Sequence, residues 1–508
     1  MTERAAPHVV VVGGGPVGLS AAFLLDRYGL RVTALERQSH PSGHPKARGV
    51  RPRTMELFAR WGLAPAIQEH GLPAEANRFI YCDSLAGEEL GRSPGSDGSS
   101  DALSSVGVCR VAQDTVERVL LAAVQQIDGV DLRFGENVTG VRQDDDKVVV
   151  STESGLELEA DYVIAADGVG STVRKLLGIV LEGEPLLGYG QSIYWRGDLS
   201  QWAADRPCIQ FITGNRMGRP GSIASVDGVD RWVTMLMRPG ARARPEPPTR
   251  EEAIDAIRVA VGADIDPEVL DIATWRLSAQ VATKWREGRI FLAGDAAHSF
   301  PPTGGFGMNT GVQDVDNLVW KLAMVAVGKA GEELLDTYEA ERIDIARSNA
   351  AWSVANSNRM AGIGKAIAAG DDAEFARLLE DQRGHVDATD QDLGFGYPTG
   401  AVAGEDDESG DALRAARRGH RFPEAVVLVG GSKQSSVVTL GDRFTFVTGD
   451  PTAWEGGLDG IKVVEAQEGL PDGSPGALVR PDGIVAWVAR PGDGPADLVA
   501  AYGQVIFQ

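Results

Sequence analysis

The start of the chain shows a strand-like, a helix-like and a second strand-like pattern in succession. Val9–Val12 is a continuous apolar run, glycines follow it, a helix-period stretch extends from about Val17 to Tyr28, and Arg31–Glu36 is again strand-like. Short apolar runs between turn residues are typical of buried strands, whereas apolar residues that recur every three to four positions are typical of a helix with one buried face. The order predicts a βαβ unit with parallel strands.

A different pattern occupies the middle of the chain. From about Ile193 to Met237 the sequence has short alternating runs rich in Ile, Tyr, Trp, Val and Thr, which are typical of an antiparallel sheet. Helical patterns return and extend to about Leu379, and the acidic, glycine-rich segment Thr399–Asp411 is typical of a linker. We therefore expect an antiparallel sheet inserted into an α/β body, followed by a separate C-terminal domain.

These patterns predict three domains, which agrees with a length of 508 residues at roughly 100–200 residues per domain. The first is expected to be discontinuous and Rossmann-like, the second to be the inserted, substrate-facing sheet, and the third to consist of short strands. The expected boundaries are 1–180 and 275–395 for the first domain, 181–274 for the second and 396–508 for the third. The predicted fold class is therefore α/β.

Charge and composition exclude several classes of partner. The 72 acidic against 49 basic residues give a formal charge of −23, so the surface repels nucleic acid and anionic lipid. The three cysteines, Cys82, Cys109 and Cys208, form no C-x-x-C pair, and the histidines show no metal-ligand spacing, so neither disulfides nor a metal are expected. No long apolar run or secretory leader is recognisable, and we expect a cytoplasmic protein without a membrane span.

The first candidate for chemistry is the glycine-rich turn between the first strand and the first helix. A G-x-G-x-x-G pattern there permits a tight turn, lets the backbone approach a pyrophosphate and directs a helix N-terminus at negative charge. An acidic residue about 20 positions on accepts hydrogen bonds from a ribose, although a solvated strand end is the alternative. The motif predicts a dinucleotide site without choosing between FAD and NAD. Its candidate residues are Gly13, Gly15, Pro16, Val17, Gly18, Glu36 and Arg37.

Two further strand-to-turn motifs follow. The apolar strand from Ala160 ends in Asp167-Gly168 before a helix start, which by itself reads as an ordinary Asp-Gly turn. A later strand ends in Gly294-Asp295, and a Pro- and Gly-rich bend then enters a long helix past Trp320. Small residues at such a helix start let backbone N–H groups approach a flat ring closely. The candidate residues in this bend and helix start are Pro302, Gly305, Gly307, Met308 and Asn309.

The three motifs in this order resemble the class A flavoprotein monooxygenases, which include p-hydroxybenzoate hydroxylase and phenol hydroxylase. The likeness extends from about Val9 to Arg342. It implies bound FAD, with Asp295 on the ribityl chain and Asp167 near the pyrophosphate, and both aspartates also serve the nicotinamide in this family. Relatives carry an arginine at Arg48 that contacts the mobile flavin.

The resemblance also assigns residues beyond the three motifs. It places Arg110 and Gln113 beside the flavin and its ribityl chain, with Gln113 the better match, and it makes His298 a structural residue beside the flavin. The segments 441–447 and 478–487 look like the thioredoxin-like C-terminal domain of the phenol and polyketide hydroxylase branch. Without a C-x-x-C pair we expect this domain to give support or to form a homodimer, rather than to perform redox chemistry.

The implied reaction is a hydroxylation. NAD(P)H, with NADPH preferred, binds transiently because the chain has one dinucleotide fingerprint. It reduces the flavin, O₂ forms a C4a-hydroperoxide, and one oxygen atom is transferred to a phenolic or polycyclic aromatic substrate, as in the secondary metabolism of polyketides and antibiotics. A hydrogen-bonding chain must help to deprotonate the phenol. Tyr194, Trp195 and Arg196 are the candidates for it, with packing as the alternative role of the two aromatic residues.

Three rival hypotheses remain at this stage. A Baeyer–Villiger-type oxygenase starts from the same flavin peroxide and is not separated from a hydroxylase by these motifs. A flavin halogenase is disfavoured because its Trp-x-Trp-x-Ile-Pro signature is absent from the sequence. A non-catalytic protein could retain FAD as a structural core, and it would show no reduction by nicotinamide.

Overall fold

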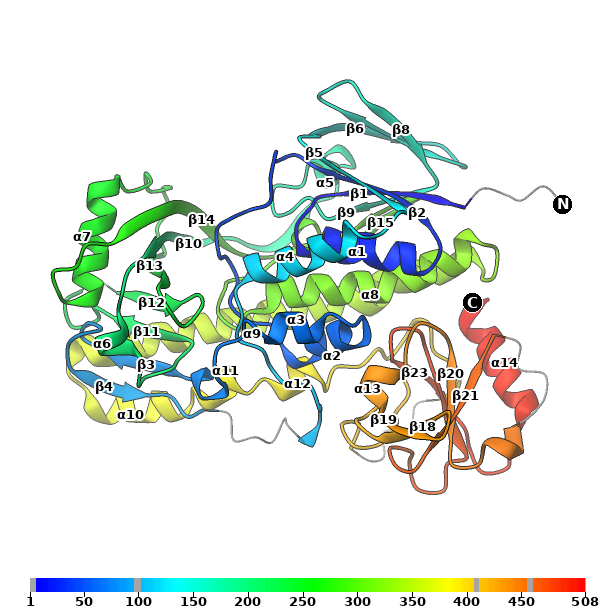
Figure 1. Cartoon of the computed structure of the whole chain (residues 1–508). Coiled ribbons are helices and arrows are strands. Elements are labelled where there is room, and N and C mark those ends of the chain that lie inside the picture. Colours follow the sequence, from blue (N-terminus) through cyan, green and yellow to red (C-terminus); the bar gives the residue numbers. More distant parts are fainter. Residues whose placement is uncertain (1–5, 96–101, 219, 406–410, 455–459, 508) are drawn as a thin grey trace.

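The structure is a computed structural model that describes residues 6–95, 102–218, 220–405, 411–454 and 460–507. Figure 1 shows a helical and parallel-sheet body beside a large mixed sheet, with the C-terminal segment forming a third body. Part of the expected linker Thr399–Asp411 lies outside the described residues. Among the helices of the described segments, none has the length and apolar character that crossing a bilayer requires.

The predicted βαβ unit is confirmed. β1 (His8–Val12), α1 (Pro16–Arg27) and β2 (Arg31–Glu36) follow in order, and β1 pairs in parallel with β2. β1 also pairs in parallel with β9 (Tyr162–Ala165), which ends directly before Asp167. The full sheet has the order β15-β16-β9-β1-β2-β5. The remaining strands are β5 (Val130–Phe134), β15 (Arg286–Glu287) and β16 (Ile290–Leu292).

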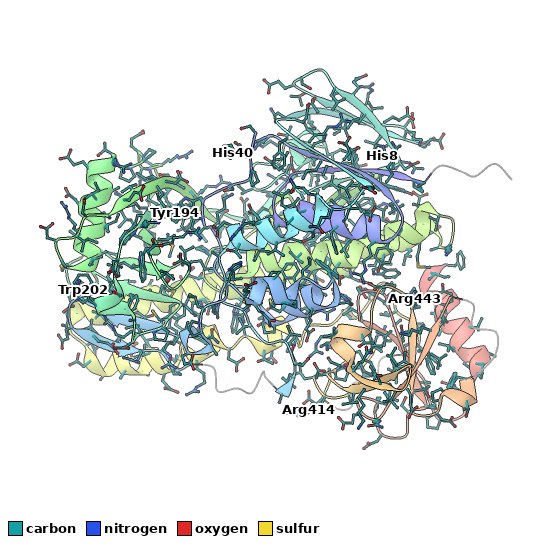
Figure 2. The ribbon with its side chains drawn as sticks, in the orientation of Figure 1. His8, His40, Tyr194, Trp202, Arg414 and Arg443 are labelled. Carbon is teal, nitrogen blue, oxygen red and sulfur yellow. The ribbon has the colours of Figure 1, made fainter. Side chains whose placement is uncertain are left out.

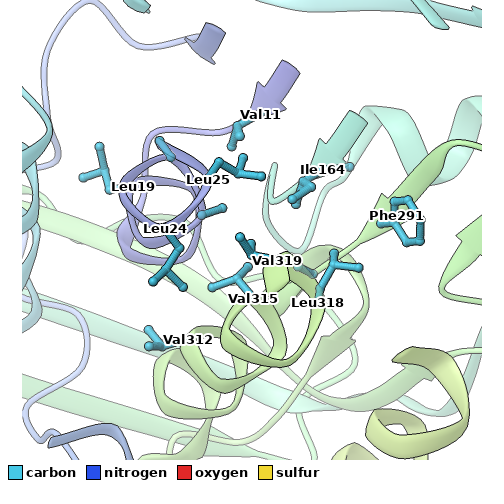
Figure 3. Close-up of a cluster of buried hydrophobic side chains, with 14 of the residues drawn as sticks. Val11, Leu19, Leu24, Leu25, Ile164, Phe291, Val312, Val315, Leu318 and Val319 are labelled. Atoms are coloured by element: carbon cyan, nitrogen blue, oxygen red, sulfur yellow. The ribbon is translucent and has the colours of Figure 1, made fainter. Parts of the chain in front are cut away.

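One apolar core joins this sheet to the helices that cover it (Figure 3). α8 (Phe306–Ala326) packs across α1, and a Cβ on Gly311 would lie 2.5 Å from the Val17 side chain, so only glycine permits this approach. The members of the core that Figure 3 labels are Val11, Leu19, Leu24, Leu25, Ile164, Phe291, Val312, Val315, Leu318 and Val319. This packing holds the carboxyl ends of β1, β9 and β16 at one edge, where all three motifs lie.

The second sheet has eight strands in the order β17-β14-β10-β13-β12-β11-β3-β4. Its two longest strands, β14 and β10, pair antiparallel. The strands are β3 (Phe79–Cys82), β4 (Glu89–Arg92), β10 (Leu181–Arg196), β11 (Gln210–Thr213), β12 (Gly221–Ser225), β13 (Arg231–Pro239), β14 (Glu268–Ala282) and β17 (His298–Ser299).

This sheet takes in more of the chain than the expected span 181–274. β3 and β4 come from the segment expected in the first domain, and β3 pairs in parallel with β11. A short apolar run such as residues 79–82 does not reveal which sheet it joins, because that depends on a partner more than a hundred residues away. The antiparallel character is confirmed, whereas the domain boundaries themselves stay a prediction.

Helices and a small sheet complete the first two bodies. The three-stranded sheet consists of β6 (Val138–Gln143), β7 (Val148–Thr152) and β8 (Glu157–Ala160). The longer helices are α2 (Pro52–Arg60), α4 (Gln113–Val124), α7 (Arg250–Val261), α9 (Asp336–Ala369) and α10 (Asp372–Glu380). The short ones include α3 (Ala64–Gln68), α5 (Thr172–Leu176), α6 (Ser200–Ala203), α11 (Arg383–Val386) and α12 (Thr389–Asp392). α9 extends from the first body to the mixed sheet (Figure 1).

The C-terminal body is a six-stranded sheet in the order β19-β18-β21-β20-β22-β23. Trp320 of α8 belongs to the same buried cluster as Phe444 and Leu478 of this body, so the body shares a core with the first one. Its elements are β18 (Val426–Val429), β19 (Ser432–Ser435), α13 (Ser436–Thr439), β20 (Thr445–Thr448), β21 (Lys462–Ala466), β22 (Gly476–Val479), β23 (Val485–Val488) and α14 (Pro495–Ile506). A thioredoxin-like fold for this body stays a prediction.

Candidate active site

The glycine turn is closed on one side and open on the other. Gly13 has φ +115°, and a Cβ there would lie 2.3 Å from the carbonyl oxygen of Ala166, so the turn packs directly against the end of β9. A Cβ on Gly18 would lie 1.9 Å from the Gly13 carbonyl oxygen. By contrast, no described heavy atom comes within 4 Å of a Cβ built on Gly15, the residue before α1. The open side therefore faces a helix N-terminus, which is a suitable place for a pyrophosphate.

Glu36 is tied to this turn. Its carboxylate accepts hydrogen bonds from the backbone N–H of Gly14, at 2.7 Å, and of Gln38, at 2.8 Å. The half-buried side chain therefore fixes the position of the glycine turn relative to β2, and it remains at the edge where a ribose would lie. Arg37 is exposed at the end of the same strand.

The two carboxylate oxygens of Asp167 differ in their hydrogen bonds to the described residues. Its Oδ2 accepts hydrogen bonds from the backbone N–H groups of Thr172, at 2.7 Å, and Val173, at 3.1 Å. Its Oδ1 is buried and finds no hydrogen-bond partner among the described residues. Buried polar atoms are normally satisfied, so this oxygen indicates a missing ligand. Gly168, at φ +82°, lets the chain turn away directly after it.

Asp295 lies across from the start of α8. It is solvent-exposed although protein atoms surround it closely, as for a residue in a hollow, and the resulting desolvation raises the pKa of its carboxyl group. A Cβ on Gly307 would lie 3.7 Å from Asp295 Oδ1, and Gly305 before the helix has φ +71°. Pro302 is exposed at the bend, whereas the Met308 side chain is buried in the core. The carboxylate and the helix start thus face the same opening.

Asn309 and Gln113 bond to protein groups instead of facing the opening. The Asn309 amide donates to the carbonyl oxygens of Gly49, at 3.1 Å, and Gly305, at 2.6 Å, and accepts from the Arg51 backbone N–H at 2.8 Å. The Gln113 side chain donates to Glu117 at 2.7 Å, and its backbone N–H donates to the Ala47 carbonyl at 2.8 Å. Both residues position the loop that carries Arg48, so any contact of these two side chains with a cofactor stays a prediction.

His298 is a supporting residue, as expected. It is fully buried, and its Nε2 lies 2.8 Å from Asp314 Oδ2. The same Asp314 oxygen accepts from the Gly294 backbone N–H at 3.1 Å, and the other accepts from Arg342 Nε at 2.9 Å. The group holds the Gly294 turn in place next to β17, the edge strand of the mixed sheet.

A hollow of about 220 Å³ lies between the first body and the mixed sheet. Arg48 and Arg110 are its two charged residues, and their guanidinium groups bond to neutral amides, Gln210 and Asn77 respectively. The other residues that line the hollow are Leu72, Val111, Ala112, Ile209, Ser225 and Val226. An apolar hollow with two convergent cations is suited to a flat ring that carries a negative or strongly polar edge.

Tyr194 lies beside this hollow, in the body of the mixed sheet (Figure 2). It packs with Ala112 and Val226, which line the hollow, and its hydroxyl accepts a hydrogen bond from Arg231 Nε at 2.6 Å. Arg231 in turn lies 2.5 Å from Asp114. The tyrosine hydroxyl is therefore held in a polar chain near the hollow.

Trp195 and Arg196 do not belong to this chain, which corrects the expectation for both. Side chains alternate between the faces of a strand, so Trp195 points to the opposite side from Tyr194. There it is fully buried and donates to Thr234 at 2.9 Å. Arg196 is exposed and lies 3.1 Å from Asp230.

The sequence reasoning missed His44. This buried histidine directly precedes the segment 45–50 that carries Arg48, and its Nδ1 lies 2.8 Å from Asp271 and its Nε2 2.8 Å from Ser192. Burial lowers the pKa of His44. Its position before Pro45 and Arg48 was a usable signal, but its partners on β10 and β14 were not predictable locally. In the described parts of the chain, no group of His, Cys, Asp or Glu could hold a metal ion.

The features of the parallel-sheet edge fit FAD. The opening at Gly15, the free oxygen of Asp167 and the carboxylate of Asp295 opposite a helix start lie along the carboxyl ends of neighbouring strands. This is where dinucleotides bind in doubly wound folds. The loop that carries Arg48 is joined to the start of α8 through Asn309, and the hollow lies between that loop and the mixed sheet.

Comparisons with known proteins agree with this geometry. Residues 7–353 match the family described as FAD binding domain. A putative polyketide hydroxylase of Streptomyces halstedii is 34% identical over 94% of this chain and 92% of its own, and an aklavinone 12-hydroxylase of Streptomyces purpurascens is 33% identical over 94% of each.

Solved structures give the same result for the whole chain. The flavin-dependent monooxygenase PieE, solved with FAD and substrate, has a TM-score of 0.90 and 28% identity over 99% of both chains. Aklavinone-11 hydroxylase, solved with FAD and aklavinone, has a TM-score of 0.82 and 31% identity over 100% of both. The chain therefore belongs to the FAD binding domain family, and with it to the flavoprotein monooxygenases.

Proposed function

We propose that this protein is an FAD- and NAD(P)H-dependent monooxygenase that hydroxylates a phenolic or polycyclic aromatic ring in secondary metabolism. The observation that carries the proposal is the position of the hollow. The loop that carries Arg48 is held to the start of α8 by Asn309, and the hollow there combines apolar walls with two convergent arginines. The relatives are named as a putative polyketide hydroxylase and as hydroxylases of aklavinone, which supports a substrate of that class.

The chain's own residues have separable tasks in this proposal. The open side of the turn at Gly15 and the free oxygen of Asp167 bind the adenosine diphosphate portion, and Asp295 with the start of α8 binds the ribityl portion. When bound, FAD would supply the redox chemistry, which is the transfer of two electrons from NAD(P)H, for which we propose NADPH, and the activation of O₂. The apolar walls exclude water from the ring, and Tyr194, held by Arg231, orients the substrate hydroxyl.

The test uses the purified protein in air. We expect a flavin spectrum, and NADPH oxidation that rises when a phenol or polycyclic phenol is added, with hydroxylated product exceeding peroxide. Product connectivity by NMR distinguishes ring hydroxylation from insertion into a carbon–carbon bond. Bound FAD that no nicotinamide reduces would overturn the proposal in favour of a non-catalytic FAD protein.

Two glycine-to-alanine variants test the proposed FAD site separately. Gly15→Ala has space in the protein and an ordinary backbone φ of −77°, yet the added methyl group occupies the place proposed for the pyrophosphate. We expect normal folding and a loss of FAD affinity of at least tenfold, measured by equilibrium dialysis. Gly449→Ala, which is equally open and lies in the C-terminal body, is the matched control and should bind FAD normally. Unchanged FAD affinity in Gly15→Ala would contradict the assignment of this opening.

A further inference from the structure

His44 bridges two strands of the mixed sheet, although it comes from the loop after β2. Its Nδ1 lies 2.8 Å from Asp271 on β14, and its Nε2 lies 2.8 Å from Ser192 on β10. A neutral imidazole has one donor and one acceptor nitrogen, so it can donate to the carboxylate and accept from the hydroxyl at the same time. Burial lowers the pKa of His44, which keeps the ring neutral at neutral pH. Residues 37–41 are exposed, so His44 begins the part of this loop that is fastened to the sheet.

The loop is fastened to the same sheet again at Arg48. The Arg48 Nη2 donates to the amide oxygen of Gln210, on β11, at 2.8 Å. The strand register places the two attachment points at opposite ends of one row of side chains that crosses the sheet. From β14 to β11 this row consists of Asp271, Tyr194, Val233, Ala224 and Gln210. Residues paired across neighbouring strands lie on one face, so residues 44–48, which we call the crossing segment, pass over this row.

The crossing segment has little slack between these two attachments. Neighbouring strands lie about 4.8 Å apart, so the four steps from β14 through β10, β13 and β12 to β11 correspond to roughly 19 Å. Four residues of extended backbone span at most about 14 Å, so the side chains of His44 and Arg48 must supply the rest. The segment forms neither helix nor strand. Its position therefore depends on the two side-chain attachments rather than on regular backbone structure.

On its other side, the same loop is tied to the first body by bonds that do not involve the His44 ring. The Gln113 backbone N–H donates to the Ala47 carbonyl at 2.8 Å, and the Asn309 amide donates to the Gly49 carbonyl at 3.1 Å. Loss of the ring should therefore release the crossing segment from the mixed sheet and leave it attached to the first body. Within the described parts of the chain, the Arg48–Gln210 bond would then be the one hydrogen bond that remains between this segment and the sheet.

We propose that His44 is a positioning residue, which holds the crossing segment against the mixed sheet and thereby fixes where the Arg48 guanidinium lies. A functional group on a long flexible side chain keeps one position only if the backbone that carries it is held. The inference rests on the proposed function, because its consequence for the reaction requires that Arg48 contact the flavin, as the family resemblance implies. His44 acts through Arg48 in this role and is not a catalytic residue.

The first test measures amide hydrogen exchange in the purified full-length chain, without turnover. The variant His44→Phe keeps a ring of similar size and removes both hydrogen bonds. Peptides that cover residues 44–50 should exchange about tenfold faster or more, whereas peptides from α1 should exchange as in the wild type. His40→Phe is the matched control, because His40 is exposed in the same loop and bonds to the neighbouring Pro41 carbonyl instead of the sheet. Unchanged exchange of residues 44–50 in His44→Phe would overturn the proposal.

Two smaller substitutions keep this test decisive if His44→Phe folds poorly. Ser192→Ala and Asp271→Ala each remove one partner of the ring, so each should accelerate the exchange of residues 44–50 by less than His44→Phe does. When both partners are already absent, His44→Phe should add little, because the bonds that it removes no longer exist. Fully additive effects of the three substitutions would contradict the assignment of these two bonds.

The second test measures the flavin and the products of the holoenzyme. His44→Phe should retain FAD, shift the flavin absorption spectrum, and reduce the share of NADPH oxidation that yields hydroxylated product by about threefold or more, because Arg48 is no longer held. His44→Gln, whose amide can still bond to one of the two strands, should recover part of both signals. Faster exchange with an unchanged spectrum and product share would show that His44 is only structural. A wild type without FAD or NADPH oxidation would instead reject the proposed function, while the exchange test still decides whether His44 holds the segment.

Discussion

Two regions of this molecule hold arginines with different partners: Arg480 in the first is buried, and Arg48 and Arg110 in the hollow are half-buried. At the contact between the first body and the C-terminal body, which we call the seam, Arg480 lies 2.7 Å from Glu341 and 2.5 Å from Asp482. Lys321 lies 2.8 Å from the same Glu341, and all four side chains are buried. In the hollow, Arg48 and Arg110 bond to amides. At the seam the cations are paired with carboxylates, so this contact is structural. In the hollow the cations have no paired carboxylate, so they can bind an anionic ligand.

The seam also combines charge with apolar packing. The Arg480 guanidinium lies 5.3 Å from the ring centre of Trp320, and Trp320 packs edge-on against Phe444. The hollow has no comparable aromatic layer among the residues that line it. Stability and binding are thus assigned to different arginines, and substitutions should separate the two.

The largest effect is expected from Glu341→Gln at the seam. The change leaves Arg480 and Lys321 short of a buried counter-charge, and breaking one side of such a pair costs about 3–5 kcal/mol. Urea unfolding followed by circular dichroism should show this loss in the free energy of unfolding. A loss below that of an ordinary surface substitution would mean that the seam is not a structural contact.

The second-largest effect is expected from acidic pH, which should reduce the stabilisation that the seam provides. Burial by itself raises the pKa of Glu341, but the attraction of Arg480 and Lys321 outweighs it and lowers the pKa to about 2, from 4.5 in an unfolded chain. The stabilisation is therefore complete above pH 4.5 and is lost as the pH falls toward 2, by roughly 3 kcal/mol at about 1.4 kcal/mol per pKa unit. Unfolding at a series of pH values should show the fall in the wild type and a smaller fall in Glu341→Gln. Parallel curves for the two proteins would contradict the assignment.

In the hollow, removal of a cation should have little effect on stability. Arg110→Met removes an unmatched charge from an apolar site, so the free energy of unfolding of the ligand-free protein should change by no more than about 1 kcal/mol in either direction. The same unfolding assay measures it. A loss as large as that of Glu341→Gln would show that Arg110 is structural and would remove the contrast between the regions.

The smallest effect is expected at the surface of the C-terminal body. Arg490 lies 3.0 Å from Glu405, but both side chains are well exposed, at 63% and 84%. Exposed pairs contribute about 0–1 kcal/mol, so Arg490→Met should lie near zero in the same assay. The variant calibrates the seam result, because it removes an ion pair of similar length without burial.

The local parts of the fold and site were predictable. The bounds of β1, α1 and β2, the glycine turn and the helix start after Gly305 all depend on short sequence patterns, and the structure has them where the patterns indicated. Tyr194 lies beside the hollow, and its role toward the substrate stays a prediction. Trp195 takes the packing role that was its alternative, because neighbouring side chains on a strand point to opposite faces. Arg196, at the end of β10, is exposed and paired with Asp230.

The partners of the key residues were not predictable. Asn77 for Arg110, Gln210 for Arg48, and Asp271 for His44 lie 33, 162 and 227 positions away along the chain. No local periodicity identifies them, because each pair depends on how β3, β11 and β14 meet the first body.

The sequence by itself determined which motifs this protein carries, its family and the class of its cofactor, because a glycine turn and its helix are built from neighbouring residues. Only the tertiary structure decided which of these arginines find carboxylates and which find amides. Chain folding brings Glu341 and Asp482 to Arg480, but brings only Asn77 to Arg110. The charged groups around a buried site come from segments that are distant in sequence. They can therefore balance one another only after the chain has folded.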